Sequence, residues 1–181
     1  MHIDDDHQHY GSALIQIAED PHFTAINAFR YKGSSSRCAF RVNKEAGVYI
    51  RYRTEPQGSR VKVYTFAFSQ DNLAELRRMS KRLARVFLAL VCVADREICC
   101  LPYPAFETLV RTRLAAKGET EAEYIVEVNA RPGKRLRVWI SPPNTKGRYL
   151  QEIIVPRNDF PAALFTGPVK GTGKPSTRLL A

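Results

Sequence analysis

The sequence lacks the short motifs on which many nucleotide-binding and hydrolytic enzymes depend. It contains no GxxxxGK[ST] or GxGxxG glycine-rich loop, so neither type of phosphate-cradling backbone is expected. It also contains no GxSxG turn for a serine nucleophile and no HExxH pair for zinc. Its four histidines all fall within the first 22 residues. We therefore do not expect a Ser/His/Asp or Cys/His catalytic arrangement.

Cysteine is scarce and is not spaced as metal ligands are. Of the four cysteines, only the adjacent pair Cys99 and Cys100 comes close to the CxxC spacing of zinc sites. His7 and His9, beside Asp4–Asp6, offer ligand atoms without surrounding groups to fix their geometry. We therefore expect no metal and no other cofactor. Buried free thiols are typical of a reducing compartment, and this indicates a cytoplasmic protein.

Long hydrophobic runs are absent as well. The longest run, Val86–Val93, is far shorter than the roughly 20 residues that a membrane-spanning helix needs. Met1 is followed by His2 and Asp4–Asp6 rather than by a basic and then an apolar region. We therefore expect neither a secretory signal nor a membrane association.

Positive charge is present in excess. The 181 residues include 28 Lys and Arg against 18 Asp and Glu, which gives a net charge of +10 at pH 7. This balance favours an anionic partner, most often nucleic acid. The hydrophobic fraction of 44% is ordinary for a globular protein of one domain. We expect a mobile N-terminus at 1–10, a single α+β domain at 11–165 and a disordered basic tail at 166–181.

The hydrophobic periodicity predicts a mixed, mainly antiparallel sheet with flanking helices. The apolar run Val86–Val93 is typical of a central strand buried on both faces. Short turns containing glycine or proline join the three strands expected before residue 69 and favour antiparallel neighbours. Ser69 is expected to cap a helix. The predicted helices span 12–18, 70–83 and 104–114, and the predicted strands span 38–42, 48–54, 61–68, 86–93, 98–101, 123–128, 135–140 and 150–155.

The segment 123–140 has the alternation of a β-hairpin. Its turn is expected at Arg131-Pro132-Gly133. One polar face is acidic on the first strand and basic on the second, so we expect cross-strand ion pairs. The residues of that face are Glu123, Ile125 and Glu127 on one strand and Arg135, Arg137 and Trp139 on the other.

The segment from Val42 to Val93 contains the strings "VYIRYRT" and "VFLALVCV" within an expected αβββαβ order. This order resembles the core of the PD-(D/E)XK nuclease-like superfamily, which implies a restriction-endonuclease-like fold. In active members, an acidic residue opens the second core strand and a Glu-x-Lys or Gln-x-Lys closes the third. These residues hold Mg²⁺ and polarise a water molecule.

The sequence departs from that pattern at the metal-binding positions. Aligning Arg51 with the lysine places Tyr49 at the Glu or Gln position, and Asn43 or Glu45 near the acidic position. A tyrosine cannot replace a carboxylate on Mg²⁺. The resemblance therefore implies an inactive relative.

A second resemblance extends from Val42 to Pro161. The strings "FRVN", "GVYIRYRT", "YTFAFS" and "VFLALVCV" are similar to a group of uncharacterised bacterial proteins with a "VN…KYST…F.F…LVC" pattern. No known activity comes with this resemblance. It implies a setting in a bacterial mobile-element or defence system.

Two basic surfaces are candidate binding sites. On the predicted strand 48–54, Tyr49, Arg51 and Arg53 share one face. Two arginines beside an exposed tyrosine would hold phosphates and stack on a base. The alternative is a solvated sheet face paired with nearby glutamates. The predicted helix 70–83 and the residues after it supply a basic stripe, which is either a phosphate contact or a solvated face. Its members are Arg78, Lys81, Arg82 and Arg85.

These features favour non-catalytic binding of nucleic acid or of another anionic partner, such as an acidic protein. Two alternatives stay open. One is a divergent Mg²⁺-dependent nuclease that uses Glu45, Glu55 or Asp71 with Arg51 or Lys62, and carboxylates clustered near Arg51 would favour it. The other is a protein-interaction subunit of a larger complex, which a contiguous apolar patch would favour.

Overall fold

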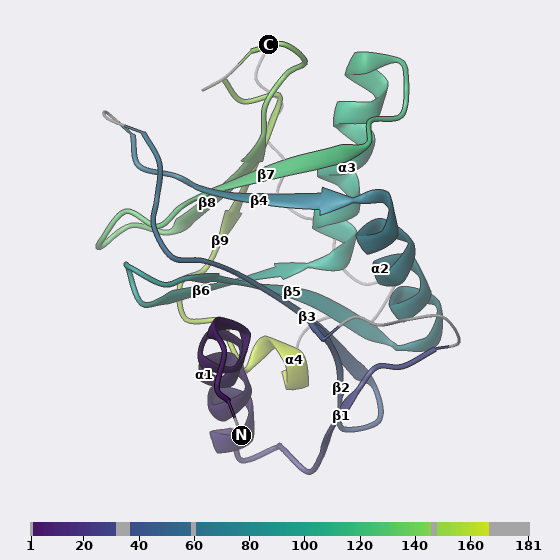
Figure 1. The fold of residues 1–181 in the computed structure, drawn as a ribbon, viewed down its shortest axis with the longest axis vertical. Coiled ribbons are helices and arrows are strands. Elements are labelled where there is room, and N and C mark those ends of the chain that lie inside the picture. Colours follow the sequence, from purple (N-terminus) through teal and green to yellow (C-terminus); the bar gives the residue numbers. More distant parts are fainter. Residues whose placement is uncertain (1, 32–36, 59–60, 146–147, 167–181) are drawn as a thin grey trace.

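The computed structural model describes residues 2–31, 37–58, 61–145 and 148–166 (Figure 1). The basic tail expected at 166–181 lies outside the described residues, apart from Thr166. None of the helices in the described ranges is long and apolar enough to cross a membrane. These helices are α1 (Asp5–Glu19), α2 (Gln70–Arg82), α3 (Tyr103–Lys117) and α4 (Ala163–Thr166).

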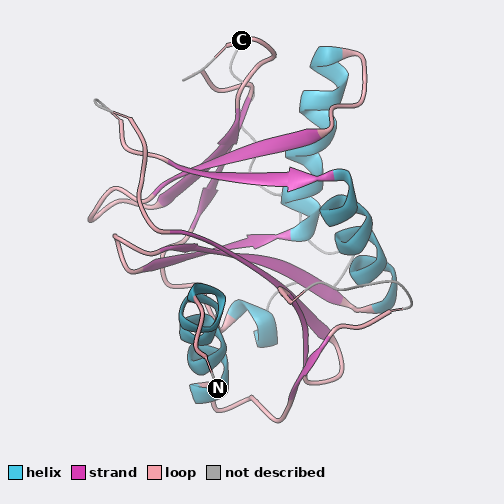
Figure 2. Cartoon of the chain, viewed as in Figure 1, coloured by secondary structure: helices cyan, strands magenta, loops and turns pink. Residues whose placement is uncertain are grey.

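The strands form two sheets (Figure 2). The five-stranded sheet has the order β1-β2-β3-β5-β6, and its neighbours are antiparallel except for β3 and β5. β3 and β5 are parallel, and the crossover connection that a parallel pair requires contains β4 and α2. The four-stranded sheet has the order β4-β7-β8-β9 and is antiparallel throughout. The bounds are β1 (Ile26–Ala28), β2 (Ala39–Val42), β3 (Ala46–Arg53), β4 (Tyr64–Ser69), β5 (Arg85–Cys92), β6 (Glu97–Pro102), β7 (Glu123–Asn129), β8 (Leu136–Ile140) and β9 (Gln151–Val155).

The five-stranded sheet lies between two hydrophobic cores. Leu88 and Leu90 of β5 point into a core shared with α2, α3 and the four-stranded sheet. Ala89 and Val91 point into a second core, which α1 and α4 cover from the other side. The apolar run from Val86 is therefore buried on both faces, as its composition predicts. The expectation of an α+β domain with a mixed, mainly antiparallel sheet and flanking helices is confirmed.

Strand β4 departs from the expected arrangement. The turn between the second and third predicted strands favours pairing within one sheet, but β4 belongs to the four-stranded sheet. Both edges of β3 are already paired, with β2 and with β5. The chain therefore has to leave the sheet after Arg53. It does so through a connection that contains Pro56 and Gly58.

Helix α1 begins earlier than expected. The sequence analysis places a helix at Ser12–Ala18 and a mobile terminus before it, whereas the structure is helical from Asp5. The Asp4 carboxylate accepts a hydrogen bond from the His7 backbone N–H, and His7 Nδ1 accepts one from the Asp4 N–H. This reciprocal cap uses histidine in place of the usual Glu or Gln, so the standard signature does not reveal it.

Helix α3 is joined to the four-stranded sheet by Arg113. Its Nε and Nη2 atoms donate to the two carboxylate oxygens of Glu121, at 2.6 and 2.8 Å. Its Nη1 atom donates to the Ser141 carbonyl at 2.6 Å. Because the Arg113 guanidinium donates these bonds, the pKa of the Glu121 carboxyl lies below its usual range.

We predict that Leu90→Ala lowers the free energy of unfolding by about 2–5 kcal/mol, because the surrounding strands cannot close around the cavity. Urea denaturation measures this change. Leu114→Ala is the matched control, since Leu114 is 36% exposed on α3, and its cost should stay below about 1 kcal/mol. Equal costs for the two variants would contradict the central position of β5.

The Glu121 carboxyl predicts a pH dependence of stability. A carboxyl whose pKa is lower in the folded state stabilises the fold above its unfolded-state pKa, and this contribution disappears as the pH falls through the folded value. The wild type should therefore lose unfolding free energy below about pH 5. Glu121→Gln should lose less over the same range. Urea unfolding at a series of pH values tests this, and identical profiles for the two proteins would count against it.

Candidate anion-binding site

Tyr49 is not part of any surface. Its side chain is 0% exposed, inside the core between the two sheets. Burial raises the pKa of its hydroxyl far above the usual value, and the neighbouring Cys38 and Glu75 raise it further. The expectation of an exposed tyrosine is therefore wrong. Alternation correctly puts Tyr49 on the same face as Arg51, but the four-stranded sheet and α2 cover that part of the face.

Arg51 and Arg53 connect the two sheets. Arg51 Nη2 donates to the Ala67 carbonyl at 3.1 Å, and Arg53 Nε donates to the Thr65 carbonyl at 2.6 Å. Both acceptors belong to β4, which is an edge strand of the four-stranded sheet and pairs only with β7. The arginines bind backbone carbonyls along the other edge. The Arg51 guanidinium also lies 5.9 Å from the centre of the Phe68 ring.

The basic stripe divides into two parts. Arg78, Lys81 and Arg82 are exposed on α2. The Arg78 guanidinium lies 4.2 Å from the centre of the Tyr31 ring, a cation–π contact. Arg85, in contrast, is the first residue of β5. Its side chain is 13% exposed and turns inward.

The guanidinium of Arg85 donates its hydrogen bonds to other residues of the protein. Its Nη1 atom donates to the Phe165 carbonyl at 2.7 Å, and its Nη2 atom donates to Glu45 at 3.1 Å. The guanidinium therefore connects α4 with the turn between β2 and β3. The structure brings Arg78, Lys81 and Arg82 together on one helix, but it does not bring them together with Tyr49, Arg51 and Arg53.

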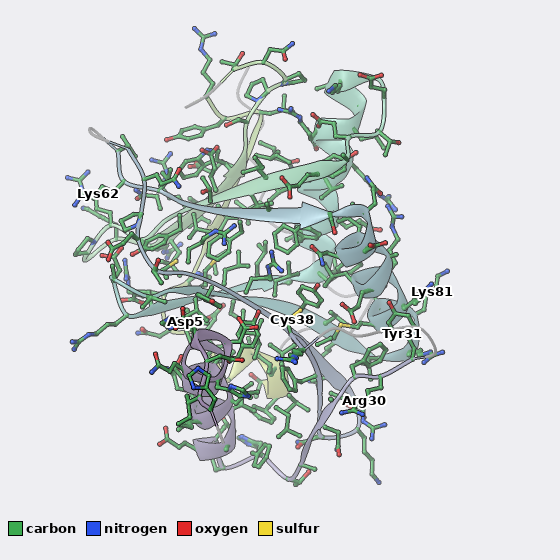
Figure 3. The ribbon with its side chains drawn as sticks, viewed as in Figure 1. Asp5, Arg30, Tyr31, Cys38, Lys62 and Lys81 are labelled. Atoms are coloured by element: carbon green, nitrogen blue, oxygen red, sulfur yellow. The ribbon has the colours of Figure 1, made fainter. Side chains whose placement is uncertain are left out.

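A second basic surface lies at the opposite side of the molecule. Figure 3 shows Lys62 on one side and Lys81, with Tyr31, on the other. Around Lys62, three turns meet to form a cleft of about 790 Å³. We call this the basic cleft. Its charged lining residues are five bases and one acid: Lys62, Arg131, Lys134, Arg135, Arg137 and Asp95.

Arg157 holds one wall of the basic cleft. It follows β9 and donates to three carbonyls of the turn between β7 and β8: Nε to Lys134 at 3.0 Å, and Nη2 to Arg131 at 2.7 Å and to Ala130 at 3.2 Å. A salt bridge to Glu97 of β6 fixes Arg157 itself. Because the backbone of this turn is held from inside, the side chains of Arg131 and Lys134 remain exposed.

The other two turns are fastened in the same way. Asn129 Nδ2 donates to the Lys62 carbonyl at 2.8 Å, which holds the hairpin before β4. The Tyr64 hydroxyl donates to Asp95 Oδ2 at 2.7 Å and accepts from the Asp95 N–H at 3.1 Å. Burial and the Asp95 carboxylate raise the pKa of Tyr64. Asp95, the one acid that lines the basic cleft, is thus hydrogen-bonded to Tyr64.

The inner wall of the basic cleft combines an aromatic ring with a paired arginine. Arg137 Nε donates to Glu152 Oε1 at 2.5 Å. The Arg137 guanidinium lies 5.1 Å from the centre of the Tyr149 ring, which packs edge-on against Trp139 at 4.8 Å. Arg137 therefore pairs with β9 and not with β7, so the expected ion pair across the β7–β8 hairpin does not form there. In the observed register Arg137 lies opposite Asn129, and Trp139 lies opposite Glu127.

Only some of the residues that line the basic cleft can be recognised as a group from the sequence. Arg131, Lys134, Arg135 and Arg137 fall within seven consecutive residues, and this run of bases is the signal that could have identified the site. Lys62 and Tyr149 come from distant segments, so no local pattern joins them to it.

Neither a candidate metal centre in the described part of the chain nor a family among known proteins is found. Within the described ranges, no group of three His, Cys, Asp or Glu side chains is placed to hold a metal ion. No family model matches the sequence, and searches of curated proteins and of solved structures find no match. Both resemblances therefore stay predictions.

We predict that replacing both Arg51 and Arg53 by alanine lowers the free energy of unfolding by about 1–3 kcal/mol, because the carbonyls of Thr65 and Ala67 lose their donors. The control is the double variant Lys81→Ala/Arg82→Ala, which removes the same charge from the exposed face of α2. Its effect should be within about 0.5 kcal/mol. Chemical denaturation measures both, and an unchanged midpoint for the Arg51/Arg53 variant would contradict the role of these residues between the sheets.

Proposed function

We propose that the protein binds nucleic acid without catalysis, through the basic cleft. The observation that carries this proposal is the concentration of five basic side chains and one engaged carboxylate in a single concave surface. Concave basic walls focus the electrostatic potential and attract polyanions. A bacterial mobile-element or defence system and a cytoplasmic location belong to the same proposal.

The side chains of the basic cleft suit phosphate contacts better than base recognition. Lys62, Arg131, Lys134 and Arg135 are exposed, and no salt bridge joins any of them to another residue in the described segments. Lysine and arginine on a rim contact phosphates regardless of sequence. We therefore expect binding with little sequence preference, and an affinity that falls as salt releases the phosphate contacts.

The nuclease alternative has less support. The carboxylates proposed for it are dispersed: Glu45 pairs with Arg85, Asp71 lies in the first turn of α2, and Glu55 follows β3. Arg51, its proposed basic partner, donates to β4. Inside the basic cleft, Asp95 is the one lining carboxylate.

One observation favours the alternative of a protein-interaction subunit. The four-stranded sheet carries exposed apolar residues on its outer face.

Fluorescence anisotropy with labelled single-stranded and duplex oligonucleotides of mixed sequence tests the proposal at low ionic strength. The double variant Lys134→Glu/Arg135→Glu should weaken binding to every oligonucleotide. The negative slope of log affinity against log salt concentration should also become shallower by about two, one for each lost phosphate contact.

The matched control is Lys81→Glu/Arg82→Glu on α2, which changes the net charge equally on the opposite side of the molecule. It should weaken binding much less than the Lys134/Arg135 variant. Failure of the wild type to bind any oligonucleotide would refute the proposed function. A larger loss in the α2 variant would instead move the binding surface to the helix.

A further inference from the structure

The outer face of the four-stranded sheet carries exposed apolar side chains. The inward residues of β7, such as Val126 and Val128, are fully buried, whereas Ile125 at an outward position is 48% exposed. Ile154 of β9 is 44% exposed, and Val61 at the rim of this face is 55% exposed. Exposed apolar residues gathered on one sheet face are typical of an interaction surface.

Charge divides this face into two halves. The basic cleft occupies one half. The other half is a groove of about 730 Å³, which we call the acidic groove, and Val61 lines both cavities. The acidic groove contains three glutamates, Glu121, Glu123 and Glu127, while its one lining arginine is Arg113. Since Arg113 is bound to Glu121, the groove keeps a negative surplus.

The strand register places the two halves symmetrically about one row of residues. Glu127 of β7 lies opposite Trp139 of β8. Glu123 is four residues from this row toward one end of the sheet, and Arg135 is four residues from it toward the other end. Each distance is about 13 Å for an extended chain, and Arg135 directly precedes β8. A half-turn about an axis that lies along this row therefore brings Glu123 to the end of the sheet where Arg135 lies, one strand spacing of about 4.8 Å away.

We propose that this face pairs with the same face of a second copy of the chain, related by a two-fold axis. In an isologous pair, a contact from residue i to residue j occurs twice. Glu123 of each copy then faces Arg135 of the other, and the exposed Ile125 and Ile154 are covered. Opposite charges meet at both ends of the interface, which fixes the register and orientation of the pair.

The pairing covers the basic cleft, and this has a functional consequence. A nucleic acid and a second copy would compete for Arg135 and its neighbours. The competition rests on the proposed function, whereas the pairing itself does not. Self-association in the absence of nucleic acid is therefore the direct observable.

Sedimentation velocity of the full chain at low ionic strength tests the pairing. The wild type should show a concentration-dependent dimer. Glu123→Lys alone and Arg135→Glu alone should each weaken dimerisation at least about tenfold, because each places two like-charged contacts in the interface. Melting midpoints within about 2 °C of the wild type would show that both variants are folded.

The decisive measurement is an equimolar mixture of the two variants. In the mixed pair, the two substituted side chains face each other with opposite charges at one end of the interface. At the other end, the unchanged Arg135 of one copy faces the unchanged Glu123 of the other, so dimerisation should return to about the wild-type level. A wild type that stays monomeric, variants that dimerise as the wild type does, or a mixture that stays monomeric would each overturn the pairing. Since Glu123→Lys leaves the basic cleft intact, oligonucleotide binding by this variant shows separately whether the proposed function holds.

Discussion

The five-stranded sheet must be covered on both faces, and this constraint decides where the other elements lie. Its strand β5 alternates between two hydrophobic cores, with Leu88 and Leu90 on one side and Ala89 and Val91 on the other. Helices α1 and α4 cover one face. The four-stranded sheet, with α2 and α3, covers the other (Figure 1). The four-stranded sheet needs only one face for this purpose, so side chains of its outer face such as Glu123 and Ile125 remain at the surface.

The excess of arginine serves two different purposes in this chain. Arg51, Arg53, Arg113 and Arg157 each donate to backbone carbonyls of another element. These side chains hold sheets and turns together, since a guanidinium has several donors in a fixed geometry. Net charge alone therefore overstates how much positive surface is available to a partner. The basic cleft depends on this division, because Arg157 holds the turn from inside while other bases of the same turn face outward.

Local pattern predicts the elements of this fold better than it predicts their assembly. The apolar composition of Val86–Val93 identifies a strand buried on both sides, and Ser69 caps α2 as expected. Alternation places Tyr49 on the face of Arg51 and Arg53, but it does not show that a second sheet covers that face. That information is absent from the local sequence because the covering strand, β4, belongs to a different sheet. The full basic cleft cannot be recognised in the sequence for the same reason, since Lys62, Asp95 and the bases of 131–137 meet only after both sheets have packed.

The binding of Arg51 and Arg53 to β4 also protects an otherwise open strand. A strand at the end of a sheet offers its backbone groups to any extended peptide, and this is a common route to intermolecular strand addition and aggregation. On β4, two of these acceptors are occupied by side chains from the same chain. The positive charge of each guanidinium further discourages a neighbouring strand. The two arginines therefore act as gatekeepers against growth of the sheet beyond the molecule.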